Sequence, residues 1–325
     1  MIDSFSPEVG FNPVALNKFE LVVGYIRNPP VAQDRHAAQR LRNGPLQDLG
    51  TLGGTPFESS EASAVNADGD VVGSSRRVFP GTPLAFVVSG GAMRGLGVLP
   101  GATESAALGI NDLGEIVGTG DCVCQTAAEH HAVLFVSGAV HDLGTLPGGR
   151  IAAAVAINNR SQIVGTSDFL VDNRNGEHPF LYENGHMTDL GTLPGGFHFG
   201  YATDINDRGQ IVGNTASNIA NVRAFLYEAG EMKDLAGANG GITVALAINN
   251  RGVIVGWTEF TVNIGHAAIF GANGPIDLND LVQAPGWELL AAIDINDKGR
   301  ILGYGFYQGN LHGFVLEQAA SKPGR

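Results

Sequence analysis

At 325 residues the chain is long enough for one or two domains, and with 44% hydrophobic and 16% charged residues it can form a large core. A net charge of -13 at pH 7 disfavours nucleic acid and membranes as partners, because both require a cationic surface. No apolar run approaches the roughly 18 residues that span a bilayer, and the first residues do not resemble a signal peptide. As written, the chain is expected to be cytoplasmic, or extracellular if a leader has been removed.

The first residues of the chain resemble the end of an internal repeat. Residues 1–4 (MIDS) align with residues 187–190 (MTDL), which the repeat pattern makes a fourth strand. Residues 12–16 then form an expected first strand that ends at an asparagine, Asn17. The chain therefore begins with the last strand of one unit and continues into the first strand of the next.

From Asn17 onward, a unit of four short strands recurs along the whole chain. Its clearest signature is residues 205–213 (INDRGQIVG), where a first strand ends at an asparagine and a turn leads into a second strand. The asparagine side chain accepts hydrogen bonds from the turn backbone, and the glycine supplies the left-handed conformation that closes the hairpin. Third strands begin with His-Ala-Phe or a variant, and fourth strands resemble Asp-Leu-Gly. The seven asparagines, 43 to 49 residues apart, are Asn17, Asn66, Asn111, Asn158, Asn206, Asn249 and Asn296.

The seventh unit has a third strand at residues 312–316 and then ends without a fourth. Residues 1–4 supply the missing strand, and repeats of 20–50 residues with four strands are typical of propellers. We therefore predict an all-β fold, a seven-bladed β-propeller of four-stranded blades, whose ring is closed by the N-terminal strand pairing with the C-terminal blade. Residues 1–320 would form this single domain and residues 321–325 a C-terminal tail.

The repeated motifs resemble a known family. Residues 142–149 and 189–196 both read DLGTLPGG, residues 205–213 read INDRGQIVG, and several third strands carry His-Ala-Phe-like triplets. In these motifs the chain is similar to the bacterial HAF-repeat family, often described as probable extracellular repeat proteins. The resemblance covers essentially the whole chain and implies no particular activity. Leu84 and Arg223 replace the histidine in the second and fifth units. Many relatives carry a leader, and this chain is expected to lack one.

Candidate functional residues lie where the chain enters each first strand, because these positions differ between otherwise similar units. A propeller brings its first strands to the axis, and variable loops on a rigid scaffold usually carry function. Residues capable of acid–base catalysis are His198, Tyr201, Glu58, Glu61 and Glu104. Residues suited to ligand binding are Arg150, Trp287, Glu288, Phe199, Phe11 and Asn12.

We expect no metal and no cofactor. The histidines of the third strands occur once per unit, so a ring keeps them apart, and each is expected to tie its strand to a neighbouring loop by a hydrogen bond. Cys122 and Cys124, followed by Glu129, His130 and His131, fit no standard zinc spacing and are interpreted as a surface loop with two free thiols. Residues 66–70 resemble a calcium loop only superficially and are expected to form a hairpin turn. The third-strand histidines are His36, His131, His178, His266 and His312.

The function predicted from these features is binding of a small organic or carbohydrate ligand in a funnel-shaped axial pocket. The alternative is a metal-independent lyase, cyclase or isomerase that uses acid–base residues in the same pocket. A weaker alternative is a protein-interaction platform. No nucleophile elbow, zincin motif, P-loop or dinucleotide fingerprint is present, so the sequence does not decide between binder and enzyme. A monomer or weak homodimer is expected.

Overall fold

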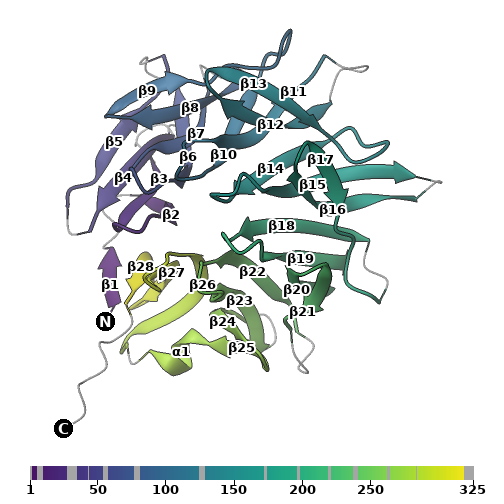
Figure 1. The fold of residues 1–325 in the computed structure, drawn as a ribbon. Helices are drawn as coiled ribbons and strands as arrows, with labels where there is room; N and C mark the ends of the chain where they lie inside the picture. The colour runs from purple at the N-terminus through teal and green to yellow at the C-terminus, as the bar shows by residue number, and fades with distance from the viewer. Residues whose placement is uncertain are drawn as a thin grey trace.

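The structure is a computed structural model that describes residues 2–5, 10–27, 35–42, 44–53, 58–76, 81–123, 129–171, 174–195, 198–218, 221–236, 241–261, 264–282 and 284–317. The predicted tail at residues 321–325 lies outside these ranges. Among the described residues almost all regular structure is β, which confirms the predicted all-β class (Figure 1). No helix in these ranges is long and apolar enough to cross a membrane.

The strands follow the repeat. The first half of the chain forms β1 (Ile2–Phe5), β2 (Asn12–Leu16), β3 (Leu21–Arg27), β4 (Arg35–Leu41), β5 (Gln47–Gly50), β6 (Ser59–Val65), β7 (Val71–Arg76), β8 (Pro83–Ser89), β9 (Ala92–Gly95), β10 (Ser105–Ile110), β11 (Ile116–Asp121), β12 (His130–Val136) and β13 (Ala139–Gly144). The middle forms β14 (Ala152–Ile157), β15 (Ile163–Val171), β16 (Arg174–Glu183), β17 (His186–Asp189), β18 (Phe199–Ile205), β19 (Ile211–Asn218), β20 (Asn221–Glu228) and β21 (Glu231–Asp234). The last part forms β22 (Thr243–Ile248), β23 (Ile254–Thr261), β24 (Ile264–Gly271), β25 (Gly274–Asp277), the short helix α1 (Leu278–Leu281), β26 (Trp287–Ile295), β27 (Ile301–Tyr307) and β28 (Asn310–Leu316).

In the described part of the chain these strands form six sheets, which differs from the predicted seven separate blades. Five sheets have four strands each, and within six of the predicted units the strands pair antiparallel in chain order. The sixth sheet has eight strands, because a single parallel pair, Glu177 and Phe199, joins the meander β14–β17 to the meander β18–β21. Both meanders keep the four-strand pattern of the repeat, so the difference arises from one bridge between neighbouring units.

The N-terminal strand pairs as the sequence predicts. β1 lies antiparallel beside β28, with Ile2 opposite Leu316 and Phe5 opposite Gly313, at the edge of the sheet β1-β28-β27-β26 (Figure 1). The last repeat thus gains its fourth strand from the beginning of the chain. The first and last strands, β1 and β28, are thereby brought side by side in one sheet.

Deleting residues 1–6 should lower the melting temperature by roughly 5 °C or more, because it removes the whole β1–β28 ladder. The uncovered backbone of β28 would also be a new sheet edge, and open edges pair with other chains. Thermal unfolding and light scattering at two protein concentrations would measure both effects. An unchanged melting temperature together with an unchanged mass would contradict the structural role of β1.

The glycine of each second strand is required by a close approach between strands. In the fourth unit, the register between β14 and β15 shifts between Ala154 and Ala156, so the first strand bulges. A β-carbon at Gly165 would collide with the backbone carbonyl of Ala153. The same collision would occur at the equivalent glycine of every other unit, which explains why the Ile-Val-Gly signature recurs.

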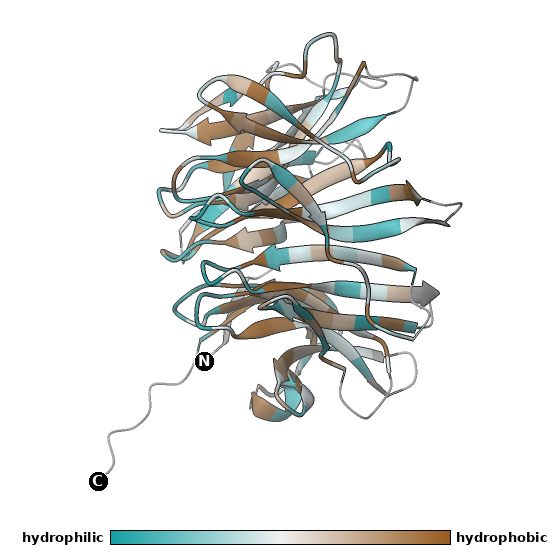
Figure 2. Ribbon diagram, turned by 45° about the vertical axis from the view of Figure 1, so that its right-hand side comes forward, coloured by the Kyte–Doolittle hydropathy of each residue, from teal (hydrophilic) through white to brown (hydrophobic). Residues whose placement is uncertain are grey.

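The core lies between neighbouring units. One apolar cluster joins Val72 and Ala85 of the second unit to Ile116 and Phe135 of the third, and the other clusters join further neighbouring pairs in the same way. A cluster of Leu16, Val22 and Leu302 joins the last unit to the first. Figure 2 shows hydrophobic colour along the strands and hydrophilic colour in many of the connecting turns. Face-to-face burial of successive sheets therefore holds the units together.

Candidate functional site

The seven repeat asparagines form a closed circuit of hydrogen bonds, here called the asparagine ring. The Nδ2 of each asparagine donates to the backbone carbonyl of the asparagine in the next unit, over 2.9–3.3 Å. The last of these bonds runs from Asn296 back to Asn17. All seven side chains are buried. The ring therefore joins every unit to the next at the end of its first strand.

Each asparagine also holds its own turn, as the sequence predicts. The Oδ1 of Asn158 accepts from the backbone N–H groups of Arg160 and Gln162, both at 3.0 Å. The third residue after the asparagine has positive φ in all seven turns, and in five of them it is glycine, as at Gly209. Ser161 and Glu20 adopt the same conformation without being glycine. One residue thus closes the hairpin and bonds the neighbouring unit.

The asparagine ring lines a cavity of about 200 Å³ at the axis. The residue after each asparagine also lines it, and these seven form what we call the outer ring. Three members are acidic and one is basic, so the mouth of the cavity is net acidic. From Ala67 to Asp297, the backbone N–H of each member donates to the side-chain oxygen of the next, as from Asp207 to Asn250 at 2.7 Å. The outer ring consists of Lys18, Ala67, Asp112, Asn159, Asp207, Asn250 and Asp297.

Two carboxyl groups beside this cavity were missed by the sequence analysis. Asp204 and Asp294 stand two residues before their asparagines, where the other five units have alanine or glycine. Asp204 accepts from the backbone N–H of Ile248 at 2.8 Å, and Asp294 accepts from that of Leu16 at 2.7 Å. Each carboxyl therefore bonds one unit to the next. An alignment of the seven repeats with one another would have revealed both substitutions.

Both carboxyls are surrounded by protein although part of each surface remains accessible. Burial raises the pKa of Asp204 to about 7, and the negative charge of Asp294 adds to the rise. Burial raises the pKa of Asp294 to about 6. The backbone N–H donors oppose these shifts but do not cancel them. The two groups thus titrate close to neutral pH and influence each other.

The predicted site residues lie at the opposite ends of the first strands from the cavity. Tyr201, for example, precedes Asn206 by five residues of extended chain, which is about 16 Å. The cavity is thus formed by the nearly constant turns, whereas the sequence analysis placed the pocket at the variable loops. The predicted location of the pocket therefore differs from that of the cavity in the structure.

Three predicted acid–base residues have local partners. The carboxylate of Glu58 is buried and accepts from the Thr51 hydroxyl at 2.7 Å and the Gly53 N–H at 3.0 Å, so it fixes the loop before β6. Glu61 forms an ion pair with Arg35 at 2.6 Å. Glu104 lies 3.4 Å from the Nε2 of His130. Each of these contacts involves a neighbouring strand or loop rather than another predicted catalytic residue.

The remaining predicted residues are spread over several units. His198, Phe199, Tyr201, Arg150 and Glu288 are exposed, and partial burial raises the pKa of Tyr201. Trp287 stacks against Tyr307 with ring centroids 5.2 Å apart. Phe11 packs against the cluster that joins the last unit to the first, and Asn12 donates to the carbonyl of Gly10 at 2.7 Å. Several of these side chains therefore have evident structural contacts.

The third-strand histidines are held by carboxylates on the fourth strands. Nδ1 of His178 lies 2.8 Å from Asp189, and His36, His131 and His266 make the same contact with their own aspartates. A hydrogen-bonding role is therefore confirmed for these four, but the partner is a strand of the same sheet rather than a neighbouring loop. His312 differs, since its buried Nδ1 lacks a hydrogen-bond partner in the part of the chain described.

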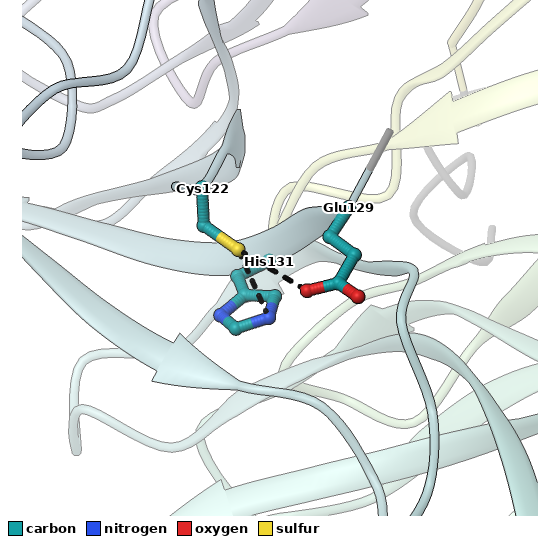
Figure 3. A group of neighbouring side chains, drawn as sticks. All are labelled: Cys122, Glu129 and His131. Carbon is teal, nitrogen blue, oxygen red and sulfur yellow. Dashed lines mark hydrogen bonds between the residues drawn. The ribbon is translucent and has the colours of Figure 1, made fainter. Parts of the chain in front are cut away.

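One histidine lies in a cluster of residues capable of binding a metal. Cys122, Glu129 and His131 direct their side chains toward one another (Figure 3), and their ligand atoms all lie within 4.8 Å of each other. Cys122 is disulfide-bonded, so the prediction of two free thiols is wrong for this residue. The sequence contains one other cysteine, Cys124, which lies outside the described residues.

Comparison with known proteins supports the fold alone. No family model matches the chain, and no curated protein matches it significantly. A prolyl endopeptidase structure is similar with a TM-score of 0.61 and 11% identity, over 95% of this chain and 50% of that one. The acylaminoacyl peptidase of Pyrococcus horikoshii is similar with a TM-score of 0.56 and 10% identity, over 94% and 50%. The chain thus spans about half the length of these peptidases. Its fold, built of four-stranded antiparallel meanders, is β-propeller-like.

Proposed function

We propose that the chain is a closed seven-bladed β-propeller that binds a small polar ligand, such as a sugar, polyol or amine, in its axial cavity. The seven-fold asparagine ring, which returns from Asn296 to Asn17, supports closure. So does the pairing of β1 with β28. The repeat motifs favour membership of the HAF-repeat family, and in that case each blade corresponds to one repeat.

The observation that carries the proposed function is the convergence of all seven repeats on one polar cavity. Its outer ring offers carboxylates at Asp207 and Asp297, amides at Asn159 and Asn250, and the ammonium of Lys18. Carboxylates and amides accept hydrogen bonds from hydroxyl or ammonium groups, which are abundant in polyols, sugars and amines. At about 200 Å³ the cavity is smaller than the roughly 300–1,000 Å³ of drug-sized sites, which favours a small ligand.

One observation favours the enzymatic alternative. Asp204 and Asp294 have raised pKa values of about 7 and about 6, and carboxyls of this kind serve as general acids near neutral pH. Their hydrogen bonds to backbone N–H groups of the next units, however, give both a structural role. We therefore place binding first, and turnover of any ligand that binds would promote the enzymatic alternative.

The experiment is thermal unfolding against a library of monosaccharides, polyols and amines, followed by calorimetry for any hit. A ligand that binds only the native state raises stability by about RT ln(1 + [L]/Kd). Asp207→Ala should weaken such a ligand about tenfold or more, and alanine is tolerated at this position in the second unit, as Ala67.

Arg150→Ala and Tyr201→Phe provide the matched controls, because both residues lie at the other end of their strands. They should leave the affinity unchanged. A ligand lost in these variants but retained in Asp207→Ala would place the site at the variable loops instead. If no compound in the library shifts the unfolding temperature, the small-ligand proposal fails.

A further inference from the structure

The cluster of Cys122, Glu129 and His131 lies in the third unit, and its chemistry differs from that of the axial cavity. The Sγ of Cys122 is 3.4 Å from the Nε2 of His131 and 3.9 Å from the nearer carboxylate oxygen of Glu129 (Figure 3). A thiolate, an imidazole nitrogen and a carboxylate oxygen are three donors that zinc prefers, and three protein ligands leave room for a fourth. The donor types therefore match zinc, and their separations allow them to converge on one ion.

The position of His131 prepares its Nε2 for this role. Its Nδ1 lies 2.8 and 3.0 Å from the two carboxylate oxygens of Asp142, on the fourth strand. A carboxylate at Nδ1 favours the tautomer with the proton on that nitrogen, which leaves the Nε2 lone pair available. Metal-binding histidines commonly donate their other ring N–H to a carboxylate in this way. His131 is thus oriented with its acceptor nitrogen toward Cys122.

The backbone holds the three residues in fixed relation. Cys122 follows the end of β11 and Glu129 precedes β12, and the N–H of Cys122 donates to the carbonyl of Glu129 at 3.1 Å. Asp121 and His130 are paired residues in the same ladder. Glu129 is only 8% exposed, so its carboxylate is held within the protein beside Cys122. The site is therefore supported by strand pairing rather than by a surface loop alone.

Comparison with the other units shows that the cluster is particular to this one. His178 has the same aspartate contact through Nδ1, but it packs against the ring of Phe169, with centroids 4.3 Å apart. The sequence has no cysteine outside residues 122 and 124. The histidine–aspartate pair is thus a common feature of the fold, and the additional thiol and buried carboxylate distinguish the third unit.

We propose that Cys122, Glu129 and His131 bind a zinc ion when Cys122 is reduced, and that oxidation of Cys122 to its disulfide prevents binding. A dithiol reductant would transfer two electrons and two protons to the disulfide, which gives two thiols and converts the reductant to its own disulfide. Zinc then replaces the proton of the Cys122 thiol, and that proton passes to solvent. The third unit would therefore hold a metal site controlled by the redox state of one cysteine.

The test is zinc titration of the full chain in competition with a chromophoric chelator, with and without a phosphine reductant that does not bind the metal. The reduced protein should bind one equivalent, and the oxidised protein should bind at least about 100-fold more weakly. With cobalt in place of zinc, a thiolate-to-metal charge-transfer band should appear only after reduction. Absence of stoichiometric binding by the reduced protein would overturn the proposal.

Variants identify the ligands. Cys122→Ser and His131→Ala should each weaken zinc binding by more than tenfold, as should the conservative Glu129→Gln, while His178→Ala is the matched control and should have no effect. Cys124→Ser removes the only other cysteine, so it should bind zinc without any reductant. Circular dichroism of each metal-free variant would confirm folding. Full binding by folded Cys122→Ser or His131→Ala would show that zinc binds elsewhere and would refute the site.

Discussion

Asn158→Ala should lower the free energy of unfolding by about 3–4 kcal/mol, a large effect for one side chain. The buried amide makes four hydrogen bonds. Its Nδ2 donates to the carbonyl of Asn206 at 2.9 Å and to the Oε1 of Gln162 at 2.8 Å, and its Oδ1 accepts from two backbone N–H groups of the turn. Alanine would remove all four and leave buried partners unsatisfied. Urea unfolding monitored by fluorescence and circular dichroism would measure the change.

The adjacent Asn159 is the matched control. It is exposed, and its side chain also bonds the next unit, at 3.1 Å from Asp207. The second unit has Ala67 at this position, so alanine is compatible with the turn. Asn159→Ala should therefore cost less than about 1 kcal/mol. If Asn158→Ala and Asn159→Ala have equal effects, the asparagine ring contributes no special stability and the large expected effect is wrong.

The repeat could be interpreted from the sequence because its chemistry is local. An asparagine that accepts from N–H groups two and four residues later, and a residue with positive φ at Gly209, are both properties of a short turn. The length of the repeat then determines how many strands each unit contains. The bond from one asparagine to the next unit was not predictable in the same way, since it depends on how neighbouring sheets pack. The repeated asparagine therefore joins neighbouring units in addition to closing its own hairpin.

The position of the cavity could not be derived from sequence variability. Variable residues such as Arg150 and Tyr201 drew attention to one end of the first strands, whereas the cavity lies at the end with nearly constant turns. The signal that did exist was a departure from the repeat. Asp204 and Asp294 replace a small residue two positions before the asparagine, which places a charge where the other units have none.

The zinc-type cluster could not be predicted from spacing either. Cys122 and His131 are nine residues apart, but the pairing of β11 with β12 brings the strand ends together. Standard zinc spacings describe ligands within one short loop or helix, so they do not cover ligands contributed by two paired strands. Knowledge of the ladder register, with Asp121 opposite His130, would have been needed to recognise the cluster.

The stability of the protein should fall as the pH rises from about 5 to about 8. The folded-state pKa values of Asp204 and Asp294, about 7 and about 6, lie above the ordinary aspartate value of 3.8. Between these values the native state retains protons that the unfolded state has lost, so deprotonation opposes folding. From pH 5 to the pKa of Asp204, about 7, is about 2 pH units, so the loss at Asp204 within this window is about 3 kcal/mol, with a smaller loss at Asp294.

Other shifted carboxyls act in a different pH range. The pKa values of Asp121 and Asp189 are lowered in the folded state, because N–H groups and nearby histidines favour the carboxylate and outweigh the opposing effect of burial. Their contribution is present above the ordinary aspartate pKa and disappears as the pH falls below about 4. Between pH 5 and pH 8, titration of Asp204 and Asp294 therefore changes the stability without a contribution from Asp121 and Asp189.

Asp204→Ala should remove most of the decline in unfolding free energy between pH 5 and pH 8. Alanine occupies the equivalent position in four other units, as at Ala156, so the backbone accommodates it. Asp294→Ala should reduce the decline in unfolding free energy by the contribution of Asp294 itself. It should reduce it further, because it also removes the charge that raises the pKa of Asp204. Urea unfolding at four pH values, with the exposed Asp68→Ala as the control for net charge, would measure each slope.

The coupling between the two carboxyls gives the sharpest outcome. If the charge of Asp294 acts on Asp204, the effects of Asp204→Ala and Asp294→Ala on the slope of stability against pH should not add. The double variant should have a flatter profile than either single variant, but the change should be smaller than the sum of the two single changes. Additive effects would mean that each group senses only its own burial. A slope in Asp204→Ala equal to that of the parent would contradict the raised pKa itself. In that case, protonation of Asp204 and Asp294 would not affect their hydrogen bonds to Ile248 and Leu16, which join neighbouring units.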